Sequence, residues 1–419
     1  MAMADRRAGI TLALCFAAAL TEGIDLQSMG VAAPMVAPEF GLDSKTLGAI
    51  LSASPVGLLC GAILGGKLAD VWGRKITLVL SMAIFGAFTL ATAMVKGTEA
   101  LLVVRFLTGL GLGGAMPNLL ALTSEAVSGQ GKVSRVVLTF AGMPVGGVIV
   151  SYVSQYAAAV QDWRIIFYVG GLAPLLLAPV MLLVLPESQR FKEEKARVAA
   201  GLAKANVNSV RVLLGDGRAL ASICLWVCCL LLNLISYLLL NWLPILNKSK
   251  GFGPEDTATL QVVYNIAGFV GSVAMGYLMD FKPGKLVLGG AFAGLAASLV
   301  LLAVTGPNVG LAAVILAVSS TCLYGCLYII YGLIPSYYPV LVRGVGGGAS
   351  FAAGRIGAII GPMLAGLILG SGRAAADVLQ ALLPVTAVAG VSAIVLLLWA
   401  RPAKEEPAKE ELAEAKALA

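Results

Sequence analysis

The decapeptide GKLADVWGRK occupies residues 66–75, between two long apolar segments. Four of its ten residues are charged, whereas charged residues make up 12% of the whole chain. The related pentapeptide GYLMD occupies residues 276–280, which is 210 positions later and half the length of the 419-residue chain. The segments 142–147 and 361–366 form a second, looser match. These spacings indicate an internal duplication, with one copy of the polar break in each half.

The composition is that of an integral membrane protein. Hydrophobic residues make up 59% of the chain, and its mean hydropathy is +0.93. Soluble domains carry about 25% charged residues, roughly twice the share found in this chain. The 50 glycines suit the close approach of helices in a bilayer. The net charge of +7 is explained by loop residues, so we expect the lipid bilayer as a partner and no nucleic acid.

A helix needs about 20 apolar residues to cross a bilayer, and the sequence contains twelve such windows. They lie at 9–37, 45–69, 75–96, 99–125, 133–158, 163–185, 217–246, 255–280, 284–305, 308–337, 343–371 and 376–400. We therefore expect an all-α membrane protein with twelve transmembrane helices in two six-helix bundles, 1–185 and 217–400. The polar stretch 186–216 would link them, and 401–419 would be a soluble tail. The first apolar run is too long for a cleaved signal, so we expect it to be retained.

The distribution of basic residues predicts the orientation. Of the 29 lysines and arginines, only six would fall in loops on the side opposite to the termini: Lys45, Lys96, Arg164, Lys248, Lys250 and Arg373. Cytoplasmic loops carry an excess of basic residues, so both termini are expected in the cytoplasm. The seven cysteines all fall in apolar segments and the chain has no histidine. Neither disulfides nor a metal site are therefore expected, and the protein is expected to be a monomer.

The segment 66–75 resembles the signature loop between the second and third helices of the major facilitator superfamily. The stretches PESQR at 186–190 and YPVLVRG at 338–344 are similar to other loops of that superfamily. The second copy of the signature, DFKPGK at 280–285, keeps the acidic and basic residues but lacks the Gly-Arg pair. The resemblance implies the two-bundle fold.

The charges of these loops are expected to form a latch between the two halves. A tight glycine turn would let Asp70 and Arg74 meet charges or helix ends of the other half. This contact would favour the outward-open state. Glu125, Asp280 and Arg343 are the further residues expected in the latch. Ordinary anchoring of the loops at the membrane surface is the alternative explanation.

Three further stretches resemble the aromatic acid:proton symporters of this superfamily. They are EGID at 22–25, GGAMPNLLALTSE at 113–125 and NWLP at 241–244. The last is especially similar to the branch that carries 3-(3-hydroxyphenyl)propionate or hydroxybenzoates. The resemblance covers all twelve expected spans but not the tail. It implies a transporter of the bacterial inner membrane that needs no cofactor and is driven by the proton gradient.

The acidic pair Glu22 and Asp25 lies near the middle of the first expected span. A central Asp costs roughly 2.5 to 3.5 kcal/mol on insertion, so two acids indicate a function. Their i, i+3 spacing places them on one helix face. Because the chain lacks histidine, they are the leading candidates for proton coupling, and Asp25 is the stronger one. The alternative for Asp25 is a fixed structural ion pair with Arg105.

Two arginines, Arg105 and Arg355, also fall inside expected spans. Arg105 is placed to pair with Asp25, or to hold substrate once Asp25 is protonated. The C-terminal half offers Arg355 no carboxylate at its depth, and a guanidinium there needs an anionic partner. A substrate carboxylate suits it, because the two groups bond in a bidentate manner. Binding to helix carbonyls, or extension toward the cytoplasmic surface, is the alternative for Arg355.

An aromatic substrate needs apolar and aromatic walls with a few polar groups. The candidates for this lining are Gln27, Asn118, Asn233, Tyr237, Tyr264, Asn265, Tyr324, Tyr328 and Tyr331. The last three tyrosines recur at i, i+4 and i+7, so they form one stripe on their helix. Helix packing is the alternative role of such a stripe.

We therefore expect a proton-coupled importer of a small aromatic carboxylic acid that works by alternating access. One proton per monoanion makes the cycle electroneutral, and two make it electrogenic; the acidic pair is compatible with both. A proton-coupled drug efflux antiporter is the alternative, although the two arginines would repel the cations that such proteins often bind. A sugar porter, a membrane-embedded enzyme and a transporter-like receptor are less favoured.

Overall fold

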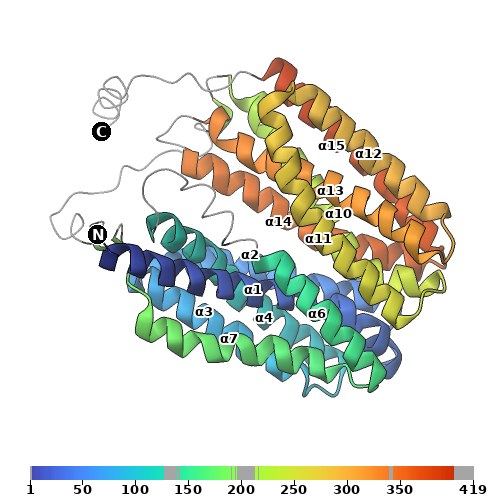
Figure 1. Cartoon of the computed structure of the whole chain (residues 1–419), viewed down its shortest axis with the longest axis horizontal. Helices are drawn as coiled ribbons and strands as arrows, with labels where there is room; N and C mark the ends of the chain where they lie inside the picture. The colour runs from blue at the N-terminus through green and yellow to red at the C-terminus, as the bar shows by residue number, and fades with distance from the viewer. Residues whose placement is uncertain are drawn as a thin grey trace.

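The computed structural model describes residues 2–126, 139, 142–189, 191–193, 195, 213–215, 217–338 and 343–400. The N-terminal half comprises α1 (Ala2–Glu39), α2 (Ser44–Trp72), α3 (Arg74–Thr92), α4 (Thr98–Ala126), α6 (Gly142–Ala159) and α7 (Arg164–Val184). The C-terminal half comprises α10 (Ala219–Ser249), α11 (Pro254–Phe281), α12 (Gly284–Val304), α13 (Val309–Leu333), the 3-10 turn η1 (Ile334–Tyr337), α14 (Arg343–Gly370) and α15 (Ala375–Trp399). Figure 1 shows the two halves against each other, with the start of α1 and the end of α15 toward one end of the molecule.

Eleven of the described helices are long and apolar enough to cross a membrane, where the sequence predicts twelve spans. The difference is α6, which covers the described part of the expected span 133–158. Most of the first nine residues of that span, and the expected tail 401–419, lie outside the described residues. The predicted all-helical architecture is confirmed, whereas the twelfth span and the cytoplasmic termini stay predictions.

The pairing of helices is repeated in the two halves. In the N-terminal half α2 packs on α4, α1 on α6, α3 on α7 and α3 on α4. In the C-terminal half the equivalent pairs are α11 on α13, α10 on α14, α12 on α15 and α12 on α13. The contacts between the halves follow the same relation, because α2 packs on α14, α6 on α11 and α1 on α10. This is the arrangement expected of two repeats related by an approximate two-fold axis.

Local sequence signals set the helix ends. Asp43 caps α2 by accepting a hydrogen bond of 2.9 Å from the backbone N–H of Thr46. Hydrogen bonds from Thr46 hold the pKa of the Asp43 carboxyl below its ordinary value. Gly73 sits between α2 and α3 with a φ of +96°, a conformation that side-chain-bearing residues rarely adopt. The glycine therefore makes the sharp turn that the signature loop requires.

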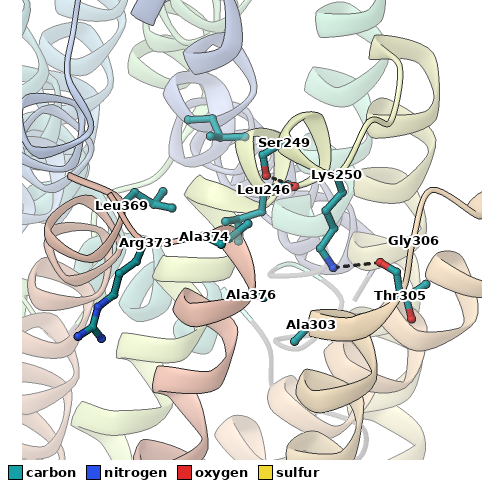
Figure 2. Close-up of a pocket in the computed structure, with 12 residues that line it drawn as sticks. Leu246, Ser249, Lys250, Ala303, Thr305, Gly306, Leu369, Arg373, Ala374 and Ala376 are labelled. Atoms are coloured by element: carbon teal, nitrogen blue, oxygen red, sulfur yellow. Dashed lines mark hydrogen bonds between the residues drawn. The ribbon is translucent and has the colours of Figure 1, made fainter. Parts of the chain in front are cut away.

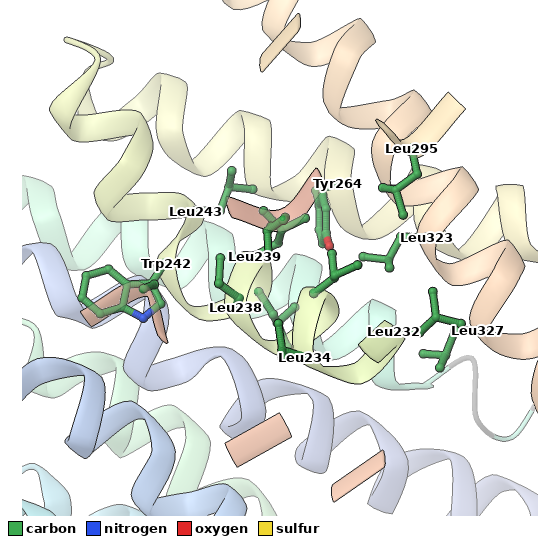
Figure 3. Packing of buried hydrophobic residues seen from close by; sticks show 14 of the residues in the cluster. Leu232, Leu234, Leu238, Leu239, Trp242, Leu243, Tyr264, Leu295, Leu323 and Leu327 are labelled. Atoms are coloured by element: carbon green, nitrogen blue, oxygen red, sulfur yellow. The ribbon is translucent and has the colours of Figure 1, made fainter. Parts of the chain in front are cut away.

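The core of the C-terminal half is built around α10. Leu238, Leu239 and Trp242 of this helix are buried in one hydrophobic cluster that also contains Tyr264 of α11 and Leu323 of α13 (Figure 3). The indole N–H of Trp242 donates a hydrogen bond of 3.0 Å to the carbonyl oxygen of Pro362 in α14. A buried indole needs such a partner, so this bond fixes α14 beside α10. The helix that carries Tyr237 is thus rigidly held.

The two halves are in backbone contact at the end of the molecule away from the start of α1, which we call the distal end. A Cβ atom on Gly48 of α2 would lie 3.0 Å from the carbonyl oxygen of Pro362 and 3.1 Å from the Cα atom of Gly366 in α14. The hydroxyl of Ser52 donates a hydrogen bond of 2.9 Å to the carbonyl oxygen of Ile359 across the same contact. Small residues thus let the backbones of α2 and α14 approach closely.

A lysine joins the halves at the same end. The ammonium group of Lys248, at the end of α10, donates a hydrogen bond of 3.1 Å to the carbonyl oxygen of Pro34 in α1. Residue 38, four positions later in α1, is also a proline. Because proline has no N–H, it leaves the carbonyl group of residue 34 without its helical donor. Lys248 takes up the acceptor that Pro38 leaves free.

Candidate functional site

Asp25 lies at the centre of the N-terminal half and is fully paired. Its side chain is 0% exposed. One carboxylate oxygen accepts hydrogen bonds from Arg105 at 3.2 Å and from the hydroxyl of Thr89 at 2.6 Å. The other oxygen lies 3.4 Å from the second terminal nitrogen of Arg105. The predicted pairing of Asp25 with Arg105 is confirmed, and Thr89 of α3 is a partner that the sequence reading missed.

Arg105 is held in place on the side away from Asp25 as well. Its side chain is 2% exposed, and its guanidinium lies over the ring of Phe167 in α7 at 5.8 Å from the ring centroid. A cation over an aromatic face is attracted by the electrons of the ring. Four helices of the N-terminal half, α1, α3, α4 and α7, therefore meet at this ion pair.

Glu22 lies one turn before Asp25 on the same face, but its surroundings differ. The side chain is 1% exposed, and its Oε1 atom has no hydrogen-bond partner among the described residues. Glu22 is therefore a buried acid without an ion pair in the described part of the chain.

Arg355 projects from α14 toward the interior rather than to a membrane surface. Its guanidinium donates a hydrogen bond of 3.1 Å to the hydroxyl of Tyr237 in α10. In this conformation Arg355 therefore binds a side-chain hydroxyl of its own half. The substrate-binding role expected of it stays a prediction.

A row of aromatic rings runs beside Arg355. Tyr264 meets Tyr324 with ring centroids 5.8 Å apart, Tyr324 stacks on Tyr328 at 6.2 Å, and Tyr328 meets Tyr331 at 6.2 Å. The row continues to Phe351 of α14, 4.8 Å from Tyr331. The predicted stripe on α13 is confirmed as one continuous face. Tyr328 is 50% exposed and Phe351 46%, so the row offers open aromatic surface.

Asn233 of α10 binds Tyr331, one of the rings of this row. Its amide N–H donates hydrogen bonds of 2.8 Å to the hydroxyl of Tyr331 and to the carbonyl oxygen of Cys229. Phe351 was not among the predicted lining residues, although it lies four positions before Arg355 and hence on the same face of α14. The four-residue spacing from Arg355 is the feature of the sequence that predicts a place for Phe351 in this lining.

Gln27 and Asn265 form a pair across the two halves. The amide of Gln27 donates to Asn265 at 2.8 Å, and the amide of Asn265 donates back at 3.0 Å. Gln261, one turn earlier on α11, donates to the same oxygen of Gln27 at 3.0 Å. The structure thus brings together Gln27 and Asn265, two of the predicted lining residues. In this conformation their amides bind each other. Gln261 was missed by the sequence reading.

Asn118 is buried in α4, and its amide N–H donates a hydrogen bond of 2.8 Å to the carbonyl oxygen of Gly114 in its own helix. Near Arg105 a cavity of about 10 Å³ lies between the halves, lined by residues of both, among them Tyr237 and Asn241. A space of this size accommodates about one water molecule. In this conformation the region beside Arg105 is therefore closed to a benzene ring.

A larger pocket, of about 490 Å³, lies elsewhere. It is lined by the ends of α10, α12 and α14 and by the start of α15, with Lys250 and Arg373 on its wall (Figure 2). Lys250 donates hydrogen bonds to the carbonyl oxygens of Leu302 and Thr305. Every residue on its wall belongs to the C-terminal half. It is therefore not a site at which the two halves alternate.

The expected latch residue Arg74 binds within its own half. Its guanidinium forms an ion pair of 2.7 Å with Glu125 at the end of α4. The backbone N–H groups of Arg74 and Lys75 donate to the carboxylate of Glu187 at 2.9 and 3.1 Å, which suits an acid at the start of a helix. Ser188 also donates to Glu125, at 2.8 Å. In this conformation Arg74 thus ties α3 to α4 and to the residues after α7, not to the other half as the sequence reading expects.

The other latch residues are placed differently. Asp70 is exposed, with no hydrogen bond or ion pair to any residue in the described ranges. The backbones of Asp280 and Arg343 belong to α11 and α14, but their side chains lie outside the described part of the structure. The expected contact between the halves at this end stays a prediction.

The two-half architecture and the signature loop are typical of one transporter family, and a family comparison agrees. The model of the major facilitator superfamily matches residues 15–362. The chain belongs to the major facilitator superfamily. As a member of this transporter family, it is a membrane transporter and not an enzyme.

Curated relatives cover almost the whole chain. It is 38% identical over 391 residues to the 3-(3-hydroxy-phenyl)propionate transporter of Escherichia coli strain K12, which covers 93% of this chain and 94% of that one. It is 34% identical over 417 residues to the 4-hydroxybenzoate transporter PcaK of Pseudomonas aeruginosa, with 92% and 91% covered. The gallate transporter of Pseudomonas putida is 30% identical over 385 residues, with 87% and 86% covered. The chain is thus similar to transporters of aromatic acids.

Solved structures share the fold. The nucleoside transporter NupG superposes with a TM-score of 0.76 at 13% identity, covering 92% of this chain and 99% of that one. The inward open form of the Escherichia coli xylose transporter XylE superposes with a TM-score of 0.73 at 17% identity, covering 97% and 99%. These similarities concern the fold alone, because their sequences have diverged so far.

Proposed function

We propose that the protein imports a small aromatic carboxylic acid together with protons, by alternating access across the bacterial inner membrane. The observation that carries the proposal is the position of Arg355. It donates a hydrogen bond to Tyr237 and lies one helical turn after Phe351, which belongs to an open row of aromatic rings with Tyr331 and Tyr328. An anion-binding group beside aromatic surface suits a ring that bears a carboxylate.

The relatives support this substrate class, since they are named as transporters of 3-(3-hydroxyphenyl)propionate, hydroxybenzoate and gallate. All three substrates unite an aromatic ring with a carboxylate. The two arginines within the membrane spans, Arg105 and Arg355, disfavour the alternative of drug efflux, because they would repel a cationic drug. Loss of proton-driven uptake in every aromatic acid tested would return drug efflux to consideration.

For the orientation, we propose twelve spans with both termini in the cytoplasm, two bundles at 1–185 and 217–400, and a monomeric protein. The excess of basic residues on the side of the termini supports this orientation. The distal end would then face the periplasm. Because the halves are in close contact there, the conformation described above would be inward-facing, and import would require the distal contacts to separate.

Uptake into proteoliposomes tests the proposal. With an imposed gradient that is acidic outside, we expect accumulation of 3-(3-hydroxyphenyl)propionate or 4-hydroxybenzoate above the external concentration. The corresponding aromatic alcohol, which lacks the carboxylate, serves as the control and should not accumulate. Uptake of the acids at the same rate without any gradient of pH or voltage would refute proton coupling.

A second measurement tests the role of Arg355. Replacing it with lysine removes the bidentate geometry but keeps the charge, so we expect affinity for the carboxylate to fall by about tenfold, the lower range for a charged hydrogen bond. Arg164→Lys is the matched control, because Arg164 pairs with Glu39 at a partly exposed site outside the central region. Equal affinities in both variants would assign Arg355 a structural role.

A further inference from the structure

The pocket of Figure 2, which we call the distal pocket, lies at the level where four membrane spans begin or end. Lys250 on its wall follows two residues after Lys248, which joins the halves at the distal end. The apolar part of the wall belongs to the spans and consists of Ile245, Leu246, Ala303 and Leu369. The polar part lies in the connections outside the spans and includes Lys250, Thr305, Gly306 and Arg373. The distal pocket therefore crosses the boundary between the hydrocarbon core and the headgroups of a bilayer.

Two basic residues stand on this wall without an acidic one. Lys250 and Arg373 lie on opposite sides of the pocket (Figure 2), and none of the described residues that line it is Asp or Glu. The Lys250 ammonium donates to two backbone carbonyls, which leaves the third of its donors available. Burial lowers the pKa of this ammonium, and a bound anion would oppose that shift. Arg373 is exposed and forms no ion pair within the described ranges, so its side chain can turn toward an anion at the rim.

The start of α15 adds a third source of positive potential. Ala374, Ala375 and Ala376 line the pocket and begin this helix of 25 residues. The backbone N–H of Ala374 donates a hydrogen bond of 2.8 Å to the carboxylate of Asp377, the acid of this first turn. The N–H groups of Ala375 and Ala376 have no acceptor within the helix, because the first turn of a helix lacks carbonyl partners. A helix N-terminus attracts an anion, so it acts in the same sense as the two basic side chains.

The shape and lining of the pocket favour a lipid over a soluble aromatic acid. None of the described residues on its wall is aromatic, whereas a site for an aromatic ring usually offers aromatic walls. Beside the pocket, α12 presents Leu301 and Val304 with 51% and 73% of their surfaces exposed. These residues belong to a span, so they offer apolar surface to acyl chains. A molecule with its charge at the rim and its apolar part at span depth matches both features.

We propose that the distal pocket binds the headgroup of an anionic phospholipid. The phosphate lies between Lys250, Arg373 and the start of α15, and the acyl chains follow the exposed face of α12. The volume of about 490 Å³ is within the range of sites that hold small organic molecules. The bound lipid ties together the ends of α10, α12, α14 and α15. This site does not depend on which molecule the protein transports.

Protection of a cysteine on the pocket wall tests the proposal. Ser249 lines the pocket and is exposed, so Ser249→Cys in a full-length protein without the native cysteines should react readily with a maleimide in neutral detergent. Added phosphatidylglycerol should slow this reaction, whereas phosphatidylethanolamine with the same acyl chains should not. Met94→Cys is the control, because Met94 is 75% exposed in the connection between α3 and α4 of the other half. Its reaction should be unaffected by either lipid.

Charge variants measure the contribution of each basic residue. Loss of one basic group near an anionic headgroup should raise the lipid concentration for half protection by about fivefold, so this shift is expected for Arg373→Gln. The double variant with Lys250→Gln should shift by about 25-fold. If the double variant fails to fold, Arg373→Glu, which reverses the charge at an exposed position, should give a similar shift. Lys96→Gln, an exposed lysine in the connection between α3 and α4, is the matched control and should leave protection unchanged.

Several results would overturn the assignment. Equal protection by the two lipids, or protection that is undiminished in both Arg373→Gln and Arg373→Glu, would show that the basic residues do not bind the headgroup. Equal protection of Ser249→Cys and Met94→Cys would indicate a general coating of the protein by lipid. Protection by glycerol 3-phosphate at the concentration at which phosphatidylglycerol acts would make the pocket a site for a soluble anion. Stronger protection by 3-(3-hydroxyphenyl)propionate than by phosphatidylglycerol would make it a second site for an aromatic acid.

Discussion

Replacing Gly48 with leucine is expected to open the distal contact between the halves. Gly48 lies in α2, directly against α14. A Cβ atom there would approach the carbonyl oxygen of Pro362 to 3.0 Å and the Cα atom of Gly366 to 3.1 Å. Both are backbone atoms of a helix that cannot give way on its own. A leucine carries three further carbon atoms, so the two helices must separate to admit it.

The magnitude follows from the nature of the contact. Overpacking costs typically about 1 to 3 kcal/mol. The gain in helix propensity on replacing a glycine, about 1 kcal/mol, leaves the conformational equilibrium unchanged, because α2 is helical in both states. The cost of overpacking falls only on the state in which the distal ends touch. The population should therefore shift toward the distally open state by about 5- to 150-fold.

Accessibility to a thiol reagent measures this shift. Leu51 is buried beside the closed cavity near Arg105, one turn from Gly48. In a protein without the native cysteines, Leu51→Cys should react slowly with a membrane-impermeant maleimide added to cells. In the background of Gly48→Leu it should react faster by a factor in the range above, and uptake of substrate should fall, because each cycle passes through the closed state.

The control is Gly290→Leu. Gly290 lies in α12, and among the described residues no atom beyond its own stretch of helix backbone lies within 4 Å of the position that a Cβ atom would take. The labelling of Leu51→Cys should therefore be unchanged by that substitution. Equal labelling in Gly48→Leu and Gly290→Leu would show that the α2–α14 contact does not close the distal end, and the inward-facing assignment would have to be abandoned.

Three further predictions concern the central region. Asp25→Asn leaves the Arg105 charge buried and unpaired, which should cost about 3 to 5 kcal/mol; the double variant with Arg105→Gln should recover part of the lost thermal stability in detergent, and an additive loss would contradict the ion pair. Gln27→Leu or Asn265→Leu alone should lower stability by about 1 to 3 kcal/mol, since one buried amide loses its partner, whereas the double variant should be closer to the unaltered protein. Tyr328→Leu should weaken binding of aromatic acids by about 0.5 to 1.5 kcal/mol in calorimetry, and unchanged affinity would exclude stacking on this ring.

The sequence predicted the central ion pair because few arrangements can satisfy buried charges. Asp25 and Arg105 are opposite charges at similar depths in two expected spans, and each needs a partner. The tyrosine stripe was equally accessible, because its spacing alone places Tyr324, Tyr328 and Tyr331 on one face. Where periodicity or charge balance determines which side chains come together, the sequence alone predicts the contact.

Other parts of the site depend on how distant helices pack, which the sequence does not specify. Thr89 and Gln261 are ordinary polar residues of apolar helices until packing places them against Asp25 and Gln27. Arg74 was expected to contact the other half, but in this conformation its guanidinium binds Glu125 of its own half and its backbone N–H binds Glu187 of the linker. The different surroundings of Glu22 and Asp25 likewise arise from three-dimensional contacts, because both acids occupy the same helix face.

The hydrogen bond from Lys248 to the carbonyl of Pro34 has a consequence for how turnover could be tuned. Its acceptor is free only because Pro38 lacks an N–H group. A residue with an N–H at position 38 would donate to the same carbonyl oxygen, so that Lys248 would share its acceptor with the helix. The strength of the distal closure is thus set by a residue that is four positions from the contact itself. Natural or laboratory evolution has here a means of changing the speed of the cycle without altering any side chain that meets the substrate.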